Sequence, residues 1–492
     1  MAQIGPAESS MFVSRVRDLI KRAPVTCAVA LPAIQVARQL TREGVGSIVV
    51  CDGQGAPLGI VTDRDLRRKV VAEGHDPSSV HAKAIMSAPL VSVDPTAFAF
   101  EAVLEMTRRE IHHLGVVESG RLVGVISTTD LLRLHAAQPV TLAREIGSAA
   151  SLKELAEHAT RLTPLVRHLL DAGGSPYDIG QMVAELNDRL TTRVLGLTAE
   201  ALASEGETPP VPFCWLALGS EARREQTLRT DQDNGLIYAD PPPELAERAT
   251  RFFSRFAGDV IRGLVGVGFP ECPAGLMASN PQWCQPLSVW TGYFRRWMTE
   301  AWPSQVDAAL ILFDLRAVSG AHELAEDLLE LIRLEAPKEQ VFLSVLAREA
   351  ISYEAPFTFW GRIAVERSGR HRGAIDVKRA GTQQLVGAGR VHALEFGLAE
   401  MNTLDRIRSA GALGVYSEDQ VLDVVDAYQL LMRLRLGHQL GQVEQGIPPD
   451  NWIDPRRLTR TEAVLLREAL RTVERVKTLV NKRYRVGSLP GL

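Results

Sequence analysis

The sequence predicts an α+β multidomain protein, and three observations support this fold class. A β-α-β-β-α pattern occurs twice in the first third of the chain. A short apolar strand at residues 213–218 leads into a Gly-Ser turn, as in an α/β domain. From about residue 322 onward the apolar spacing is almost entirely helical. We therefore expect three domains, at residues 1–138, 139–330 and 331–492.

Composition limits the classes of function. The chain has 492 residues, of which 46% are hydrophobic and 23% charged, so each domain has enough apolar residues for a core. The formal net charge of −4 does not support a nucleic-acid partner. Five scattered cysteines without metal-ligand spacing are typical of a reducing compartment. Because no apolar run is long enough to span a membrane, we expect a cytoplasmic protein with no membrane partner.

The repeat is clearest at one octapeptide. Gly-Ile-Val-Thr-Asp-Arg-Asp-Leu at residues 59–66 recurs as Gly-Val-Ile-Ser-Thr-Thr-Asp-Leu at residues 124–131, an offset of 65 residues. Each copy follows a helical segment (residues 34–42 and 98–109) and a β-rich run (residues 47–51 and 114–118). Two copies indicate a duplication rather than a solenoid.

These units resemble paired CBS (cystathionine beta-synthase) domains, over about residues 12–136. The resemblance implies that an adenine nucleotide (AMP, ADP or ATP) binds, with Thr62 and Ser127 on phosphate and Asp65 and Asp130 on ribose hydroxyls. It also implies a homodimer formed through this pair. A carboxylate can accept from both ribose hydroxyls, and a hydroxyl can donate to phosphate. The two aspartates are equally suited to cap the helices that follow, and the two roles are compatible.

The rest of the chain alternates helix-rich and strand-rich stretches. Residues 142–202 have helical spacing, interrupted by Gly-Gly-Ser-Pro at 173–176. Residues 307–316 (DAALILFDLR) are expected to form a second short strand of the α/β domain. Two long helices are expected at residues 421–440 and 458–484, the second with an apolar stripe.

One motif carries the chemistry. Gly219-Ser220 is followed, after ten residues, by Asp231-Gln232-Asp233. A Gly-Ser turn offers backbone N–H groups and a hydroxyl to phosphate oxygens. Two aspartates one residue apart on a strand share one face and can hold Mg²⁺. The same residues also suit a turn without any metal.

The stretch from Trp215 to Asp233 is similar to the signature of the DNA polymerase beta-type nucleotidyltransferases. Within that superfamily it resembles the domain found beside CBS modules in bacterial signalling proteins, which is related to the N-terminal domain of PII uridylyltransferases. Further segments match the same family, and the resemblance covers about residues 150–485; these segments are residues 272–283, 313–316, 375–379 and 402–406.

The resemblance implies a role for each site residue. Gly219 and Ser220 would contact the triphosphate, and Asp231 and Asp233 would bind Mg²⁺ or Mn²⁺. Asp314 is the candidate for the third carboxylate. The candidates for phosphate neutralisation are all basic residues: Arg223 or Arg224, Lys378 or Arg379, and Arg316, which is expected on the same strand face as Asp314.

The function predicted in this way is transfer of a nucleoside monophosphate from a nucleoside triphosphate to an acceptor hydroxyl, on a protein as in PII uridylyltransferases. Adenine nucleotides at the CBS pair would regulate it. Two alternatives stay open: a catalytically silent nucleotide-binding regulator, and a transferase acting on a small molecule. The silent alternative rests on Ala222, where relatives commonly have Gly, and on Gln232 and Asn234, where most have apolar residues.

Overall fold

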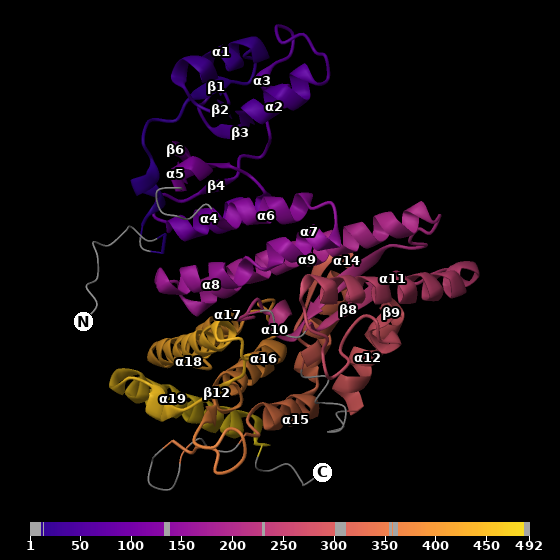
Figure 1. The fold of residues 1–492 in the computed structure, drawn as a ribbon, viewed down its shortest axis with the longest axis vertical. Helices are drawn as coiled ribbons and strands as arrows, with labels where there is room; N and C mark the ends of the chain where they lie inside the picture. The colour runs from indigo at the N-terminus through magenta and orange to yellow at the C-terminus, as the bar shows by residue number, and fades with distance from the viewer. Residues whose placement is uncertain are drawn as a thin grey trace. The chain divides into compact units, whose positions relative to one another are not determined.

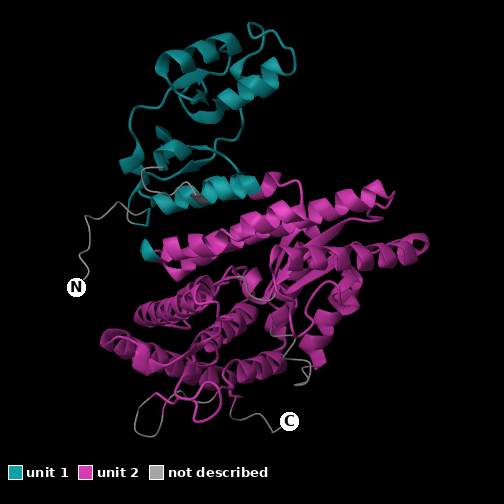
Figure 2. Cartoon of the chain, viewed as in Figure 1, with its two compact units in different colours: residues 1–145, 171–173 teal, residues 146–170, 174–492 magenta. Residues whose placement is uncertain are grey.

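The computed structural model describes residues 11–12, 14–131, 138–228, 232–300, 311–353, 357 and 363–486. The chain forms two compact units (Figure 2). Unit 1 comprises residues 1–145 and 171–173, and unit 2 comprises residues 146–170 and 174–492.

Unit 1 contains the two copies of the repeat, each built on a three-stranded sheet. In the first copy, β1 (Thr26–Ala28) pairs in parallel with β2 (Ser47–Cys51), which pairs antiparallel with β3 (Pro57–Thr62). In the second copy, β4 (Ser92–Val93), β5 (His113–Glu118) and β6 (Arg121–Ser127) have the same arrangement. The duplication expected from the sequence is therefore present in three dimensions.

The helices of unit 1 also repeat. They are α1 (Ala33–Glu43), α2 (Asp63–Leu66), η2 (Arg67–Val71) and α3 (Ala82–Ile85) in the first copy, and α4 (Ala99–Arg109) and α5 (Thr128–Leu131) in the second, with η1 (Val16–Leu19) ahead of both. Helix α6 (Gln138–Ser148) follows them, and its residues 146–148 belong to unit 2. Helix α1 ends at Gly44 with φ of 61°, and α4 ends at Glu110 with φ of 53°. Both helices therefore stop at a left-handed residue at equivalent positions of the repeat.

Unit 2 begins with α7 (Leu152–Ala159), α8 (Leu162–Asp171) and the long α9 (Pro176–Ser204). A four-stranded sheet follows in the order β10-β7-β8-β9, with β7 (Phe213–Leu218) and β8 (Asn234–Tyr238) at its centre and β9 (Cys284–Pro286) and β10 (Leu315–Gly320) at its edges. Its helices are α10 (Gly219–Ala222), η4 (Pro243–Leu245), α11 (Ala246–Val267), η5 (Pro281–Trp283), α12 (Leu287–Glu300) and α14 (Glu323–Glu335).

Aromatic side chains fix this sheet against its helices. The Phe253 ring of α11 stacks on Tyr238 of β8, with ring centroids 4.5 Å apart, and Phe256 meets Phe213 of β7 edge-on at 5.2 Å. From α12, the indole N–H of Trp290 donates to the carbonyl of Leu236 at 3.3 Å. The strand expected at residues 213–218 is present, and it is buried because helices cover it.

The C-terminal part of unit 2 is helical, as expected, except for the short ladder of β11 (Ile375–Asp376) with β12 (Trp452–Ile453). Its elements are η6 (Ala336–Lys338), α15 (Gln340–Ala350), η7 (Lys378–Thr382), α16 (Gln383–Phe396), α17 (Thr403–Ala412), α18 (Glu418–Glu444), η8 (Pro455–Arg457) and α19 (Arg460–Tyr484). Helices α18 and α19, drawn towards the yellow end of the colour bar in Figure 1, pack along each other. The third predicted domain, residues 331–492, lies in unit 2. The second, residues 139–330, also lies in unit 2 except for residues 139–145 and 171–173, which belong to unit 1.

One expected strand is wrong in its bounds. Within the segment 307–316, the described residues Ile311 and Leu312 are helical, and β10 begins only at Leu315. A short apolar run does not distinguish a buried helix from a buried strand, so periodicity alone could not place this boundary.

Candidate active site and nucleotide pockets

The Gly-Ser turn leaves the central strand β7 and forms a tight bend. Gly219 has φ of 57°, which is a left-handed conformation that favours glycine. A Cβ atom at this position would lie 2.9 Å from Cγ2 of Ile311 and 3.3 Å from Oδ2 of Asp233. The Gly219 N–H donates to the backbone carbonyl of Asp314 at 2.9 Å. The turn therefore lies directly against the carboxylate of Asp233, and only glycine fits there.

Asp233 is brought to the turn by strand pairing. Its backbone carbonyl accepts from the Leu218 N–H at 2.9 Å, and β8 begins at the next residue. The Asp233 side chain is half-buried. Burial raises the pKa of the Cys272 thiol, and a hydrogen bond with the Asp233 carboxylate raises it further. The other motif carboxylate, Asp231, lies outside the described residues.

Glu221, which sequence reasoning did not single out, belongs to the same turn. It is 7% exposed. Burial raises its pKa to about 8, and the charges of Asp188 and Asp233 add to this effect while Arg316 opposes it. A carboxyl group held protonated at neutral pH beside Gly219 and Ser220 limits the negative charge of this turn.

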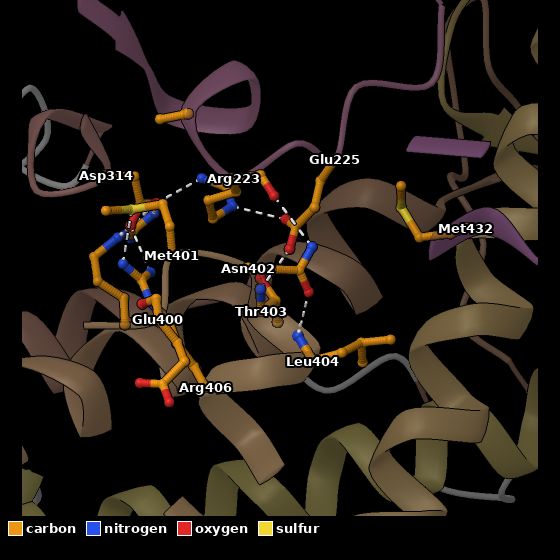
Figure 3. A network of polar contacts seen from close by, with 12 residues as sticks. Arg223, Glu225, Asp314, Glu400, Met401, Asn402, Thr403, Leu404, Arg406 and Met432 are labelled. Carbon is orange, nitrogen blue, oxygen red and sulfur yellow. Dashed lines mark hydrogen bonds and ion pairs between the residues drawn. The ribbon is translucent and has the colours of Figure 1, made fainter. Parts of the chain in front are cut away.

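Asp314 lies at the centre of an arginine cluster (Figure 3). Its side chain is fully buried. Oδ2 accepts from Arg223 Nη1 and from Arg390 Nη2, both at 2.6 Å, and Oδ1 accepts from Arg406 Nη1 at 2.5 Å. Burial opposes ionisation of Asp314, but the three guanidinium groups outweigh it and hold its pKa well below the usual range. Both carboxylate oxygens are thus occupied, and a metal ligand at Asp314 stays a prediction that requires these contacts to rearrange.

The arginine cluster continues into the helical part of unit 2. Arg223 Nε donates to Glu225 Oε2 at 2.7 Å, and Glu225 Oε1 accepts from the Thr403 N–H at 2.6 Å. Asn402 caps α17 by accepting from Leu404 N–H, and its Nδ2 donates to the Arg223 carbonyl at 3.1 Å. Figure 3 shows these contacts joining Arg223, which follows α10, to the start of α17.

The sequence analysis indicated only one of the two arginines that α16 and α17 contribute to this cluster. Arg406 belongs to the segment 402–406, which carried the family resemblance, whereas Arg390 was part of no motif. The structure places both side chains more than nine-tenths buried. Their contact with Asp314 joins residues that are 76 and 92 positions apart in sequence.

The other predicted basic residues lie elsewhere. Arg224, with φ of 58°, extends towards Glu185 and Asp188, and Lys378 is exposed at the start of η7. Arg316 forms two hydrogen bonds with Asp188, at 2.8 and 2.9 Å, rather than lying beside Asp314. The expectation of a shared strand face for Arg316 and Asp314 is wrong because Asp314 precedes β10.

The three residues that departed from the family pattern have structural explanations. Ala222 is the last residue of α10 and has no positive φ, so the alanine is not strained. Asn234 Nδ2 donates to Gln232 Oε1 at 3.1 Å, and Asn234 Oδ1 accepts from the Ala278 N–H at 2.9 Å. The two amides therefore fix the loop between α11 and η5 onto the sheet.

Unit 1 contains two cavities that correspond to the two repeat motifs. A cavity of about 960 Å³ is lined by Thr62, Asp65, Lys69, Arg109 and both histidines His112 and His113, among others. Asp65 Oδ2 accepts from the Thr62 hydroxyl at 2.7 Å and from its N–H at 3.0 Å, and Oδ1 meets Lys69 Nζ at 2.9 Å. Burial opposes ionisation of Asp65, but these bonds keep its pKa lowered.

A smaller cavity of about 340 Å³ is lined by Ser127 and Asp130. Asp130 Oδ2 accepts from the Ser127 hydroxyl at 2.6 Å and from its N–H at 2.8 Å, and Oδ1 pairs with Lys21. Gly46 and His113 line both cavities. Both motif aspartates therefore accept hydrogen bonds from the hydroxyl residue three positions earlier and also lie on cavity walls, so the capping role is compatible with an open cavity at each motif.

Within the described part of the chain, no group of three or more His, Cys, Asp or Glu side chains could hold a metal ion. None of the helices found there is long and apolar enough to cross a membrane.

The fold and the turn facing Asp233 define a class of protein, in which a duplicated β-α-β-β-α unit is joined to a nucleotidyltransferase-type domain and a helical domain. The family models agree. "CBS domain" matches residues 16–72 and 82–137, "Putative nucleotidyltransferase DUF294" matches residues 160–304, and "Putative nucleotidyltransferase substrate binding domain" matches residues 340–484. The chain belongs to the DUF294 nucleotidyltransferase family, in its CBS-domain-containing form.

Curated relatives match about a quarter of this chain. Uncharacterized protein MK0525 of Methanopyrus kandleri is 32% identical over 132 residues, which are 27% of this chain and 67% of that protein. Hypoxic response protein 1 of Mycobacterium tuberculosis is 30% identical over 118 residues, 24% of this chain and 82% of that protein. The CBS domain-containing protein CBSCBSPB3 of Arabidopsis thaliana is 27% identical, and the match spans 29% of this chain and about a quarter of the plant protein's length.

Among solved structures, the CBS domain protein PAE2072 from Pyrobaculum aerophilum, complexed with AMP, is 32% identical. The match covers 25% of this chain and 99% of that chain, with a TM-score of 0.23.

Proposed function

We propose that unit 2 transfers a nucleoside monophosphate from a nucleoside triphosphate to an acceptor hydroxyl, and that adenine nucleotides bound in unit 1 regulate this transfer. The proposal depends mainly on one observation, the closeness of the Gly219 turn to the Asp233 carboxylate. A Cβ atom built on Gly219 would lie 3.3 Å from Oδ2 of Asp233. A phosphate-accepting turn and a carboxylate at this spacing suit a metal-bound triphosphate.

The residues fit Mg²⁺ or Mn²⁺. Asp233 and Asp231 supply carboxylate oxygens, which are the donors that these hard cations prefer. When bound, the cation would neutralise charge on the phosphates and on the leaving pyrophosphate. Asp314 stays the candidate for a third ligand. In the transfer, the acceptor oxygen forms a bond to the α-phosphorus while the bond from the α-phosphorus to pyrophosphate breaks.

The arginines of the cluster support triphosphate binding because their positive charges outnumber the neighbouring carboxylates. Arg223, Arg390 and Arg406 carry three positive charges, against the two carboxylates of Asp314 and Glu225. Since the cluster hydrogen-bonds to the backbone of the phosphate turn through Asp314, it provides a positive field beside the triphosphate. We assign phosphate contacts to Gly219 and Ser220, and retain Arg223, Arg224 and Lys378 as candidates.

The regulatory part of the proposal rests on the two cavities of unit 1. Thr62 and Asp65 line one, and Ser127 and Asp130 line the other, as a nucleotide ligand bound through hydroxyl and carboxylate groups would require. Calorimetric titration of AMP and ATP into the full chain tests this assignment. We expect Asp65→Ala/Asp130→Ala to abolish the binding seen for wild type, and equal binding by both proteins would exclude these sites. We also propose a homodimer formed through unit 1, which the mass in solution tests.

The transferase is tested with α-phosphate-labelled ATP, UTP, GTP and CTP in turn, with Mg²⁺ or Mn²⁺ and a cell lysate. Label transfer by wild type that is lost in Asp231→Asn/Asp233→Asn would support the enzyme and identify its nucleotide. Label in a protein from UTP would support the version similar to PII uridylyltransferase.

A second candidate function is a catalytically silent nucleotide-binding regulator. The observation that favours it is the pairing of both Asp314 oxygens with arginines, which would have to give way to a metal ion at that carboxylate. Binding of a triphosphate without any label transfer, under all of the conditions above, would favour this candidate.

A further inference from the structure

Helix α9 carries three polar side chains in its middle that are buried or nearly so. Glu185 and Asn187 are more than nine-tenths buried, and the Asp188 side chain is 13% exposed. Burial of a charge or an amide is costly unless the group is paired. Glu185 and Asp188 form ion pairs with Arg224. The Asn187 amide donates to Gln226 Oε1 at 2.9 Å. Helix α9 therefore supports the chain where it leaves α10.

Asp188 also pairs with Arg316 of β10, and this contact is bidentate. Arg316 Nη1 donates to Oδ2 of Asp188 at 2.8 Å, and Nη2 donates to Oδ1 at 2.9 Å. Burial opposes the charge of Arg316, but the Asp188 carboxylate outweighs it and raises the pKa of the guanidinium above its ordinary value. Because both groups are planar and joined by two parallel bonds, Asp188 fixes the orientation of the guanidinium.

The same guanidinium contacts the end of the turn. Arg316 Nη2 donates to the Glu221 carbonyl and Nε to the Ala222 carbonyl, both at 3.3 Å. These are the last two residues of α10, and the final carbonyls of a helix lack helical partners. At the start of the turn, the Gly219 N–H donates to the Asp314 carbonyl at 2.9 Å. The turn is therefore held at both ends, and Arg316 holds its C-terminal end.

Helix α9 also packs closely on the backbone that follows the turn. A Cβ atom on Gly180 would lie 2.7 Å from the carbonyl oxygen of Arg224. Arg224 has φ of 58°, a left-handed conformation that costs free energy in a residue with a side chain and persists only where the surroundings enforce it. Since Asp188 Oδ2 also lies 3.5 Å from Nη2 of Arg224, α9 contacts both the backbone and the side chain of this residue.

We propose that Asp188 is a positioning residue of the candidate nucleotide site: by holding Arg316, it keeps the turn where Gly219 and Ser220 can contact a triphosphate beside Asp233. The proposal rests on the proposed nucleotidyl transfer. Asp188 acts through the arginine and does not touch the nucleotide. Without the carboxylate, the buried guanidinium loses its bidentate partner and turns towards other acceptors, and the two carbonyls at the end of α10 lose their donor.

The first test measures amide hydrogen exchange of the full chain by mass spectrometry, in the peptide that covers residues 218–226. An asparagine keeps the shape of Asp188 but has one acceptor oxygen instead of two, so we expect Asp188→Asn to speed exchange in this peptide about tenfold or more. Glu395→Gln is the matched control. Glu395 holds Arg483 in a similar bidentate pair, at 2.7 and 2.6 Å, but this pair joins α16 to α19. Exchange in the turn peptide of this control should equal that of wild type.

A second pair of variants tests the path through Arg316. Arg316→Gln should also speed exchange in the turn peptide, and adding Asp188→Asn to it should change the rate less than about twofold, because the effect of Asp188 passes through the arginine. The double variant leaves neither charge unpaired, so this comparison decides even where Asp188→Asn alone does not fold. Unchanged exchange in a folded Asp188→Asn protein, or effects of the two substitutions that multiply, would overturn the proposal.

Triphosphate affinity is the functional readout, and it does not depend on turnover. In calorimetric titrations of each triphosphate with Mg²⁺, we expect Asp188→Asn to weaken binding about tenfold and Glu395→Gln to leave it unchanged. Label transfer at saturating triphosphate should fall less than the affinity does, since the turn binds the substrate as well as the transition state. Equal affinity in wild type and Asp188→Asn would overturn the proposal. Binding by wild type without label transfer would contradict the transferase function alone, and the affinities would still decide the role of Asp188.

Discussion

Replacement of Asp314 by asparagine tests the arginine cluster most directly. The change preserves the shape of the side chain and removes the one charge that three guanidinium groups share. Arg223, Arg390 and Arg406 then stay buried with only Glu225 as an acidic partner in the cluster. Loss of one partner from a buried ion pair typically costs about 3–5 kcal/mol. Since domains are typically stable by about 5–15 kcal/mol, we expect Asp314→Asn to remove a large part of the stability of unit 2.

Tryptophan fluorescence during urea unfolding is the suitable assay. All seven tryptophans belong to unit 2, so the signal reports its unfolding and not that of unit 1. The matched control is Asp423→Asn, which removes an ion pair with Arg475 of similar length, 2.9 Å, whose side chains are 56% and 58% exposed. An exposed pair contributes about 0–1 kcal/mol. If Asp314→Asn lowers the free energy of unfolding no more than Asp423→Asn does, the reasoning about the buried cluster is refuted.

Three further predictions concern Glu221 and Gly219 in the turn and Asn402, the N-cap residue of α17. Burial raises the pKa of Glu221 to about 8 from an ordinary 4.5. The bound proton of Glu221 therefore stabilises the folded state in full below pH 4.5, and this stabilisation is lost as pH rises through about 8. Glu221→Gln should therefore become more stable than wild type with increasing pH over this window, and parallel urea curves for the two proteins would contradict the assignment. Gly219→Ala, with φ of 57° and a contact at 2.9 Å, should cost about 1–3 kcal/mol and abolish label transfer, whereas full transfer would show that the turn is not close-packed. Asn402→Ala loses the cap of α17 and the bond to the Arg223 carbonyl, so the thermal midpoint should fall by the equivalent of about 1–2 kcal/mol, and an unchanged midpoint would argue against both contacts.

Local features of the fold could be predicted from the sequence because local patterns encode them. The repeated octapeptide predicted the duplicated unit, and the apolar run at residues 213–218 predicted β7 with its bounds. The glycine at position 219 was predicted to contact the triphosphate, which stays a prediction; its positive φ is a finding of the structure. Each of these inferences depends on residues adjacent in the chain or at a fixed period.

Other features depend on contacts between residues that are far apart in the sequence, and sequence patterns could not predict these contacts. Gln232 and Asn234 look like departures from a strand pattern, but each finds its partner in a loop that only the folded chain brings near. Asp314 was expected at the end of a strand, whereas the structure places it before β10, where the run of apolar residues is helical in part.

The sequence by itself determined the family, the duplicated unit and the helical C-terminal region. Only the tertiary structure decided that Asp314 is shared by arginines from α10's flank, α16 and α17. The physical reason is that hydrophobic periodicity reports which face of an element is buried, while the partner of a buried charge is chosen by contacts between segments far apart in the chain.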